Sequence, residues 1–405
     1  MRDWQKIEGH LGTPQGFRGA AAAAGIKKAA GTLDLGLLFS EAEKTSAAGV
    51  FTTNLAAAAP VLYSRTALRA SGGWARAVVV NSGNANAATG RAGLRAAAET
   101  ARSTAKLLGI RTNDVLVCST GVIGVPLALA RILAQLPELA RSLSQSGAAA
   151  LAQSIMTTDT FPKTATLVSD WRGKPVHLAG VAKGAGMIHP RMATMLAFVT
   201  TDAAARPGEL RKLLTAAVGA SFNRISVDGD TSTNDTVLIL SSGLSSVEIK
   251  GGKIEQWFQG GLTELCQTLA KMIVRDGEGA HKLVTIEVTG AASAADADRV
   301  ARAVANSPLV KTAIAGSDPN WGRIICAAGY SGARFDPAKV DIRINHLYLC
   351  RRGLDAGFDE AAARRELDGN ELTIRLDLHQ GKSSTLFWTC DFTHDYIDIN
   401  ASYRT

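Results

Sequence analysis

A glycine-rich segment that leads into a threonine is the part of this chain best suited to chemistry. It reads Lys183-Gly-Ala-Gly-Met-Ile-His-Pro-Arg-Met-Ala-Thr-Met-Leu196. If the chain breaks its own Ala193–Thr194 bond, Thr194 gains an α-amine that titrates at about pH 7.7–8 and can take the proton of the Thr194 hydroxyl. Thr194 is therefore a candidate N-terminal nucleophile. The alternatives are an ordinary glycine turn entering a strand and, more weakly because a third glycine is missing, a dinucleotide site.

A second polar turn, Ser119-Thr-Gly-Val-Ile-Gly124, follows a predicted strand that ends at Cys118. Backbone N–H groups at Thr120 and Gly121 are candidates for stabilising a developing oxyanion. Such donors lower a reaction barrier by roughly 3–4 kcal/mol each. The alternative is a helix-capping turn before Pro126.

Two further loops are rich in amides, hydroxyls and carboxylates. Residues 81–90 suit either a zwitterionic substrate or the satisfaction of loop backbone. Residues 223–235 contain three aspartates that resemble a calcium loop, but position 12 counted from Asp228 is Ile239 instead of glutamate. The sequence also lacks HExxH, GxxxxGK[ST] and GxSxG patterns and any metal-spaced cysteine and histidine cluster. We therefore expect no metal.

The segment Arg275-Asp-Gly-Glu-Gly-Ala-His-Lys282 places a carboxylate between two glycines. Glu278 can hold a substrate ammonium there, or it can face solvent in a helix C-cap. The chain ends in Ile399-Asn-Ala-Ser-Tyr-Arg-Thr405, and a frayed tail is the simplest interpretation of these residues alone.

Strand and helix patterns alternate along most of the chain and predict an α/β fold. Strands are expected at 77–81, 114–118 and 194–200, and helices at 92–108, 126–136, 207–220 and 262–274. Further strands at 282–288, 340–345, 372–378 and 385–389 follow in near succession, which favours an antiparallel sheet.

Composition narrows the classes of partner and compartment. The 405 residues allow about two to three domains. The net charge of +8 is spread without a dense basic run, which favours small anionic metabolites over nucleic acid. No stretch approaches the ~20 apolar residues of a membrane span. Five widely spaced cysteines and a charged N-terminus without a secretory pattern predict a cytoplasmic protein.

Taken in order, these motifs closely resemble the ornithine acetyltransferase family of arginine biosynthesis, also called the glutamate N-acetyltransferase family. The resemblance covers nearly the whole chain. It rests on residues 49–54, 80–86, 119–124, 156–160, 183–202, 222–236, 276–279, 317–323 and 400–405. The chain departs from the usual family pattern at Leu55, Ala185 and Arg191, the last of which lies near the expected cleavage point and bears on the cleavage rate.

The resemblance implies a layered α-β-β-α sandwich of the N-terminal-nucleophile-like, autoprocessing type with a second, smaller α/β domain. Cleavage between Ala193 and Thr194 would give an alpha chain of residues 1–193 and a beta chain of residues 194–405 that remain associated. The approximate structural split is a main domain of residues 1–280, a smaller domain of residues 281–390, and a tail of residues 391–405 that returns to the active site.

The resemblance also assigns roles within the site. Thr194 becomes the nucleophile, and Thr120 and Gly121 form the oxyanion hole. The residues implied to line the substrate site are Thr157, Lys183, Thr194, Glu278, Asn400 and Thr405.

The activity implied is acetyl transfer from N2-acetyl-L-ornithine to L-glutamate through an acetyl-threonine intermediate, by a ping-pong cycle. No cofactor is expected, although acetyl-coenzyme A is possible as an alternative donor. The expected assembly is an α2β2 heterotetramer that binds neither nucleic acid nor membrane. One rival is an N-terminal-nucleophile amidase or aminopeptidase, which passes the acyl group to water; another is a noncatalytic basic binding protein.

Overall fold

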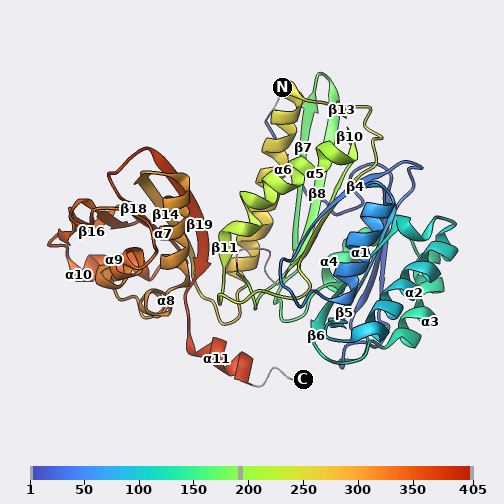
Figure 1. The fold of residues 1–405 in the computed structure, drawn as a ribbon, viewed down its shortest axis with the longest axis horizontal. Coiled ribbons are helices and arrows are strands. Elements are labelled where there is room, and N and C mark those ends of the chain that lie inside the picture. Colours follow the sequence, from blue (N-terminus) through green and yellow to red (C-terminus); the bar gives the residue numbers. More distant parts are fainter. Residues whose placement is uncertain (1–2, 190–194, 402–405) are drawn as a thin grey trace. The chain divides into compact units, whose positions relative to one another are not determined.

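The computed structural model describes residues 3–189 and 195–401. The chain forms two compact units, one of Met1–Asn223 with Asp230–Ile273 and the other of Arg224–Gly229 with Val274–Thr405. Both mix helices and strands (Figure 1). The expected cleavage point between Ala193 and Thr194 lies outside the described residues.

Two sheets pack face to face in the first unit. Among the described residues, the larger has six strands in the order β1 (Gln5–Lys6), β7 (Lys163–Trp171), β8 (Lys174–Lys183), β9 (Leu196–Thr201), β12 (Thr236–Ser241) and β4 (Ser46–Phe51). The other has four, in the order β2 (Phe17–Ala22), β3 (Leu35–Ser40), β5 (Ala77–Asn84) and β6 (Val115–Val122). Leu38 and Val80 of the smaller sheet and Phe198 and Leu238 of the larger belong to the buried core between the sheets.

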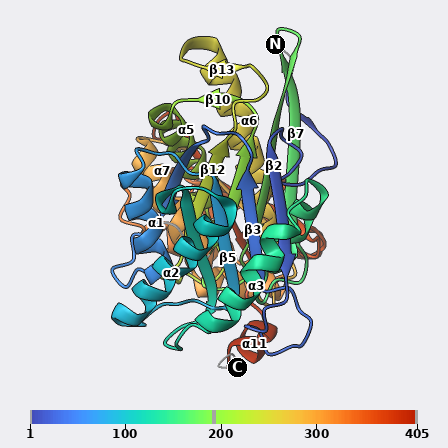
Figure 2. The same cartoon turned by 90° about the vertical axis from the view of Figure 1, so that its right-hand side faces the viewer.

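Helices cover the outer face of each of these sheets. Helices α1 (Ala59–Ala70), α2 (Gly90–Leu108) and α3 (Leu129–Arg141) lie over the four-stranded sheet (Figure 2). Helices α5 (Pro207–Gly219) and α6 (Gly252–Arg275) pack on the six-stranded sheet. Gly180 of β8 allows this close approach, because a Cβ there would lie 2.8 Å from Leu269 of α6. The four layers confirm the expected α-β-β-α arrangement.

Short elements complete this unit: α4 (Leu151–Ser154) and the paired strands β10 (Ala204–Ala205) and β13 (Glu248–Ile249). No helix in the described ranges is long and apolar enough to cross a bilayer.

The second unit is built on one mixed sheet. Its strand order over the described residues is β11 (Ile225–Ser226), β19 (Ser383–Cys390), β14 (Leu283–Ala291), β18 (Glu371–Asp377), β15 (Asp341–Ile344), β16 (Leu347–Arg351) and β17 (Leu354–Asp355). Helices of this unit are α7 (Ala294–Asn306), α8 (Pro308–Ala315), α9 (Trp321–Gly329), α10 (Glu360–Leu367) and α11 (His394–Ala401). The expectation of an antiparallel sheet is only partly right, since β14 pairs with β18 in parallel. The long connection between them, which contains the four helices α7 to α10, permits the crossover that parallel strands need.

Most expected elements are present, with shifted ends. Helix α2 ends where Gly109 takes the left-handed conformation at φ +65°, which suits glycine. The helix expected from residue 262 begins at Gly252 and runs through Gly260 and Gly261. Gly261 is needed there because a Cβ would lie 2.2 Å from the Trp4 indole. A helical glycine pair therefore marks a tertiary contact here, and not a helix start.

Candidate functional site

The predicted site segment enters the middle of the six-stranded sheet. Leu196, the first residue of β9, pairs with Lys183 at the end of β8 on one side and with Thr236 of β12 on the other. Thr236 in turn pairs with Phe51 at the end of β4. These four residues form one row across four adjacent strands. Leu196, the member of the row on β9, comes two residues after the predicted nucleophile. Thr194 itself lies outside the described residues.

Lys183 is buried beside a second buried charge, Asp159. The Asp159 carboxylate accepts hydrogen bonds from the Lys163 ammonium at 2.6 Å and from the Gly184 N–H at 2.7 Å on one oxygen. Its other oxygen accepts from the Thr157 N–H at 2.9 Å. Asp159 therefore fixes the backbone at Thr157 and at Gly184, which follows Lys183. Thr157 and Lys183 are both predicted substrate residues.

The charges around Asp159 favour its ionised form. Burial by itself raises the pKa of this carboxyl, but the Lys183 and Lys163 ammoniums and the Gly184 N–H outweigh burial and bring the pKa to about 2. The carboxylate is consequently ionised throughout the physiological pH range.

Asp235 and its neighbour Asn234 connect β9 to the predicted oxyanion turn. Oδ1 of Asp235 accepts a hydrogen bond from the Met195 N–H at 3.0 Å. The Asn234 side-chain amide donates to the carbonyl oxygens of Ser119 at 2.8 Å and Ala85 at 2.7 Å. Asp235 and Asn234 thus bind Met195, the residue after position 194, and Ser119, the residue before Thr120.

The Asp235 side chain is fully buried. Burial raises its pKa well above the ordinary value, although the Met195 N–H and the Lys183 charge act in the opposite direction. Asp235 therefore favours its neutral form much more than Asp159 does. The Lys183 charge thus acts on two buried carboxyls whose pKa shifts are opposite, a contrast typical of functional sites.

Thr120 and Gly121 lie at the end of β6, where the parallel pairing with β5 becomes irregular. Thr120 is buried, and the preceding Ser119 hydroxyl donates to Oδ1 of Asn81 at 2.6 Å. Gly121 has φ +128°, and a Cβ there would lie 2.3 Å from the Gly83 carbonyl carbon. Glycine is required at this position because β6 lies close against β5 here. The expectation of a turn directly after Cys118 is wrong, since the strand continues to Val122 and Thr120 and Gly121 lie within it.

Glu278 and Asn400 meet in the second unit. The Asn400 side-chain amide donates to Oε2 of Glu278 at 2.9 Å. Gly279, at φ +68°, lets this loop approach the start of α11, since a Cβ would lie 2.4 Å from the Tyr396 nitrogen. The Thr393 hydroxyl adds a hydrogen bond of 2.6 Å to the Gly279 carbonyl oxygen. The C-terminal helix is therefore attached to the Glu278 loop, while Thr405 lies outside the described residues.

Sequence reasoning missed three residues that the structure brings to the first-unit site: Asp159, Asn234 and Asp235. Asp159 and Asp235 lie within segments 156–160 and 222–236, which carry the family resemblance, but only their burial and partners show that they act on Lys183 and Met195. Lys27 is a further basic neighbour: burial lowers its pKa, although the Asp34 and Asp159 carboxylates act to raise it. Within the described ranges, no group of three or more histidine, cysteine, aspartate or glutamate side chains could hold a metal ion.

Comparison with known proteins identifies close relatives over the full length. The family model described as the ArgJ family matches residues 18–405. The arginine biosynthesis bifunctional protein ArgJ of Symbiobacterium thermophilum is 50% identical over 402 residues, covering 98% of this chain and 99% of that protein. The protein of the same name from Gloeobacter violaceus is 45% identical over 413 residues, covering both chains fully.

One solved structure is similar over half of this chain. It is the crystal structure of arginine biosynthesis bifunctional protein ArgJ from Bacillus halodurans, 45% identical, with a TM-score of 0.50. The match covers 98% of that chain but only 51% of this one.

Proposed function

The chain belongs to the ArgJ family, and from this membership we propose that it transfers an acetyl group from N2-acetyl-L-ornithine to L-glutamate. The relatives' name, arginine biosynthesis bifunctional protein, supports this assignment over an amidase or aminopeptidase. The observation that carries the proposal on this chain's own residues is the hydrogen bond from the Met195 N–H to buried Asp235. Lys183 acts on this carboxyl, and the adjacent Asn234 binds the residue before Thr120 in β6.

Thr194 is the nucleophile in this proposal, and self-cleavage after Ala193 supplies its α-amine. The Bacillus halodurans chain supports a division of this kind, because nearly all of it corresponds to about half of the present chain. Residues 194–405 make up a similar share of the sequence. Asp235 then fixes the Met195 amide and so anchors the new terminus at the start of β9.

The reaction proceeds in two balanced steps. The Thr194 α-amine takes the proton of the Thr194 hydroxyl, whose oxygen attacks the acetyl carbonyl of N2-acetyl-L-ornithine, while Thr120 and Gly121 stabilise the oxyanion. The C–N bond breaks, and ornithine leaves with that proton on its amine. The glutamate amine then attacks the acetyl-threonine ester, and N-acetyl-L-glutamate leaves as the hydroxyl of Thr194 is restored.

The charge balance around Lys183 suits the carboxylate that both amino acids share. Two ammoniums, those of Lys183 and Lys163, act on the ionised Asp159, and Asp235 favours its neutral form. The net charge around Lys183 is therefore positive and attracts a substrate carboxylate. Glu278, oriented by Asn400, is the group we assign to a substrate ammonium.

Other aspects of the proposal follow the family. Acetyl-coenzyme A serves as a second acetyl donor if the name bifunctional applies to this chain, and no cofactor takes part. We assign an α2β2 assembly of cleaved chains and a cytoplasmic location. The five cysteines, all free thiols, support a reducing compartment.

The central test is replacement of the nucleophile, T194A, with T194S as the matched variant that retains a hydroxyl. Intact mass should show two fragments, of residues 1–193 and 194–405, for the native protein. T194A should remain one polypeptide without acetyl transfer, whereas T194S should retain some cleavage and some transfer. A cleaved and active T194A protein would defeat the mechanism. Deacetylation of acetylornithine at a rate independent of glutamate would instead favour the amidase.

A further inference from the structure

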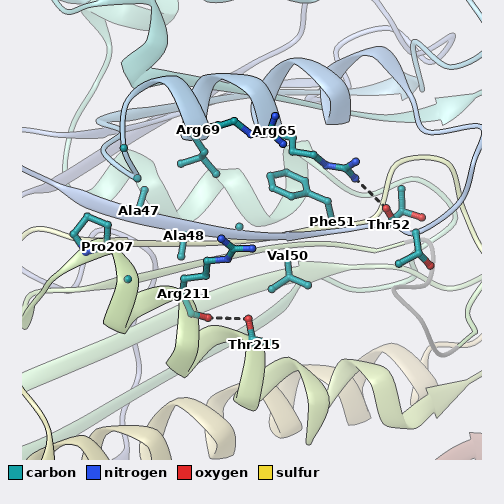
Figure 3. Close-up of a pocket in the computed structure, with 16 residues that line it drawn as sticks. Ala47, Ala48, Val50, Phe51, Thr52, Arg65, Arg69, Pro207, Arg211 and Thr215 are labelled. Carbon is teal, nitrogen blue, oxygen red and sulfur yellow. Dashed lines mark hydrogen bonds between the residues drawn. The ribbon is translucent and has the colours of Figure 1, made fainter.

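A groove of about 650 Å³ runs along the outer edge of the first unit (Figure 3). Its floor is β4, the last strand of the six-stranded sheet, and its walls come from α1 and the first half of α5. The volume lies within the range of small-molecule sites, which is about 300–1,000 Å³.

The lining of the groove is strongly positive. Arg65 and Arg69 lie four residues apart on α1, and Arg211 comes from α5 on the opposite wall. No aspartate or glutamate is among the lining residues, and none of the three guanidiniums forms an ion pair with a carboxylate in the described part of the chain. Figure 3 shows the Arg211 side chain extending from α5 towards β4. Three cations around a concave surface concentrate anions there.

One arginine is held in place for such a role. The Arg65 guanidinium donates to the Thr52 carbonyl oxygen at 3.1 Å and lies 5.7 Å from the centre of the Phe51 ring. The Phe51 ring itself needs Gly49, because a Cβ at residue 49 would lie 2.6 Å from that ring. A guanidinium has five donors, so these contacts leave Arg65 able to bind a further acceptor.

The edge of β4 adds backbone donors. The Ala47 N–H points away from β12 and donates to the Gly73 carbonyl oxygen at 2.8 Å. Because alternate residues of a strand present their N–H groups on the same side, those of Gly49 and Phe51 face the groove. Among the described residues, neither of these two N–H groups donates to a backbone carbonyl outside the β4–β12 pairing.

The free part of this edge is too short for another strand. It is closed at one end by the Ala47 hydrogen bond and at the other by Arg65 on the Thr52 carbonyl. Only Gly49 and Phe51 remain, whereas an average strand has about 5–6 residues. A compact ligand therefore fits the edge better than an added peptide strand.

The N-terminal end of α5 also favours an anion in the groove. Pro207 and Gly208, in the first turn of this 13-residue helix, line the groove. The N-terminus of a helix carries a partial positive charge and free N–H groups. Glu209 in that turn is not among the lining residues, and its carboxylate accepts from the Arg206 N–H at 3.3 Å.

We propose that this groove is a second binding site, which takes a small polyanion with two or more phosphate or carboxylate groups. Arg65, Arg69 and Arg211 bind the anionic groups, and the N–H groups of Gly49 and Phe51 complete the site. The proposal does not depend on the acetyl-transfer assignment. The groove also borders the proposed active site, because the Thr52 N–H donates to the Asp235 carbonyl oxygen at 2.9 Å.

The test is calorimetric titration of the full-length protein with inorganic triphosphate and, separately, with citrate. We expect one equivalent to bind, more weakly at higher salt. R65Q and R211Q should each weaken binding by roughly tenfold, as expected for loss of one charge-assisted contact. R95Q is the matched control: Arg95 is an exposed arginine on α2 outside the groove, so the variant has the same net charge and should bind as the native protein does.

Each outcome decides the proposal. Preference for triphosphate over citrate would identify a phosphate ligand, and the reverse a carboxylate ligand. Absence of binding at millimolar probe, several weak equivalents, or equal affinity for native protein, R65Q and R211Q would each overturn it. Circular dichroism and thermal unfolding of each variant would confirm that it is folded. The T194A protein should bind the probe as the native protein does, which separates this site from the fate of the catalytic proposal.

Discussion

Replacing Asp159 with asparagine removes one charge from the buried network beside Lys183 and leaves the side-chain shape unchanged. The asparagine oxygen can still accept one of the backbone hydrogen bonds from Thr157 or Gly184. What is lost is the carboxylate that faces the Lys163 ammonium at 2.6 Å, in a pair whose side chains are both fully buried. The D159N variant therefore measures how strongly that charge stabilises the first unit.

The size of the effect follows from the pKa of the carboxyl. A decrease from the ordinary value of 3.8 to about 2 corresponds to about 2 kcal/mol of folding free energy at neutral pH. Removing one partner of a buried ion pair costs about 3–5 kcal/mol. We therefore expect D159N to lower the free energy of unfolding by about 2–5 kcal/mol at pH 7.

The effect should depend on pH with a definite sign. Because the folded pKa lies below the unfolded one, the unfolded chain binds more protons between the two values. The stabilisation is complete above pH 3.8 and is lost as the pH falls through about 2. The native protein and D159N should therefore approach each other in stability as the pH decreases below about 4.

Urea unfolding combined with amide hydrogen exchange of peptides from β7 and β8 would restrict the measurement to the first unit. D170N is the matched control, because Asp170 accepts a hydrogen bond of 2.8 Å from the Gly173 N–H in an exposed hairpin turn. That variant should change stability by less than about 0.5 kcal/mol. A D159N effect below about 1 kcal/mol at pH 7, or one that persists unchanged in acid, would refute the reasoning.

Two further substitutions test Gly121 and the Asp235 carboxyl. G121A should lower the free energy of unfolding by more than about 2 kcal/mol and abolish acetyl transfer, because a Cβ would meet the Gly83 backbone. The control is G124A, where φ is +81° and no atom lies within 4 Å; it should lose only about 1 kcal/mol. Equal losses in the two variants would contradict the steric argument. D235N should match the native protein in urea unfolding at low pH and become the more stable of the two as the pH rises from 3.8 to the raised Asp235 pKa. In that range the unfolded carboxyl ionises while the buried one keeps its proton, so the native protein loses stability. Parallel pH profiles would contradict a raised pKa for Asp235.

The segments of the proposed site could be singled out from sequence because they combine residue types that backbone geometry demands with those that chemistry demands, although Thr120 and Gly121 lie within β6 and not in the expected turn. Glycine at position 121 and the segment leading from Lys183 towards Thr194 were singled out on those grounds. The contacts of Asp159 and Asp235 could not be found in the same way. Each has a distant partner, Gly184 at 25 residues from Asp159 and Met195 at 40 residues from Asp235, and nothing in local spacing reports such pairs.

The pairing of strands in the sheet of the second unit could also be predicted only in part from the sequence. Alternating patterns identify β14 and β18 as strands, but their parallel pairing depends on which edge is available after the intervening helices have packed. The charged groove at β4 likewise unites β4 and α1 with α5, which lies more than a hundred residues further along the chain.

The sequence by itself determined most types of element, the glycine that ends α2 and the family resemblance, because these depend on local backbone preference and on residue identity. Only the tertiary structure decided which carboxyls are buried, which amide each one holds and where the arginines converge. Those properties arise from removing charged groups from water and placing them beside particular partners, and the free energy of that process is set by distances through space and not along the chain.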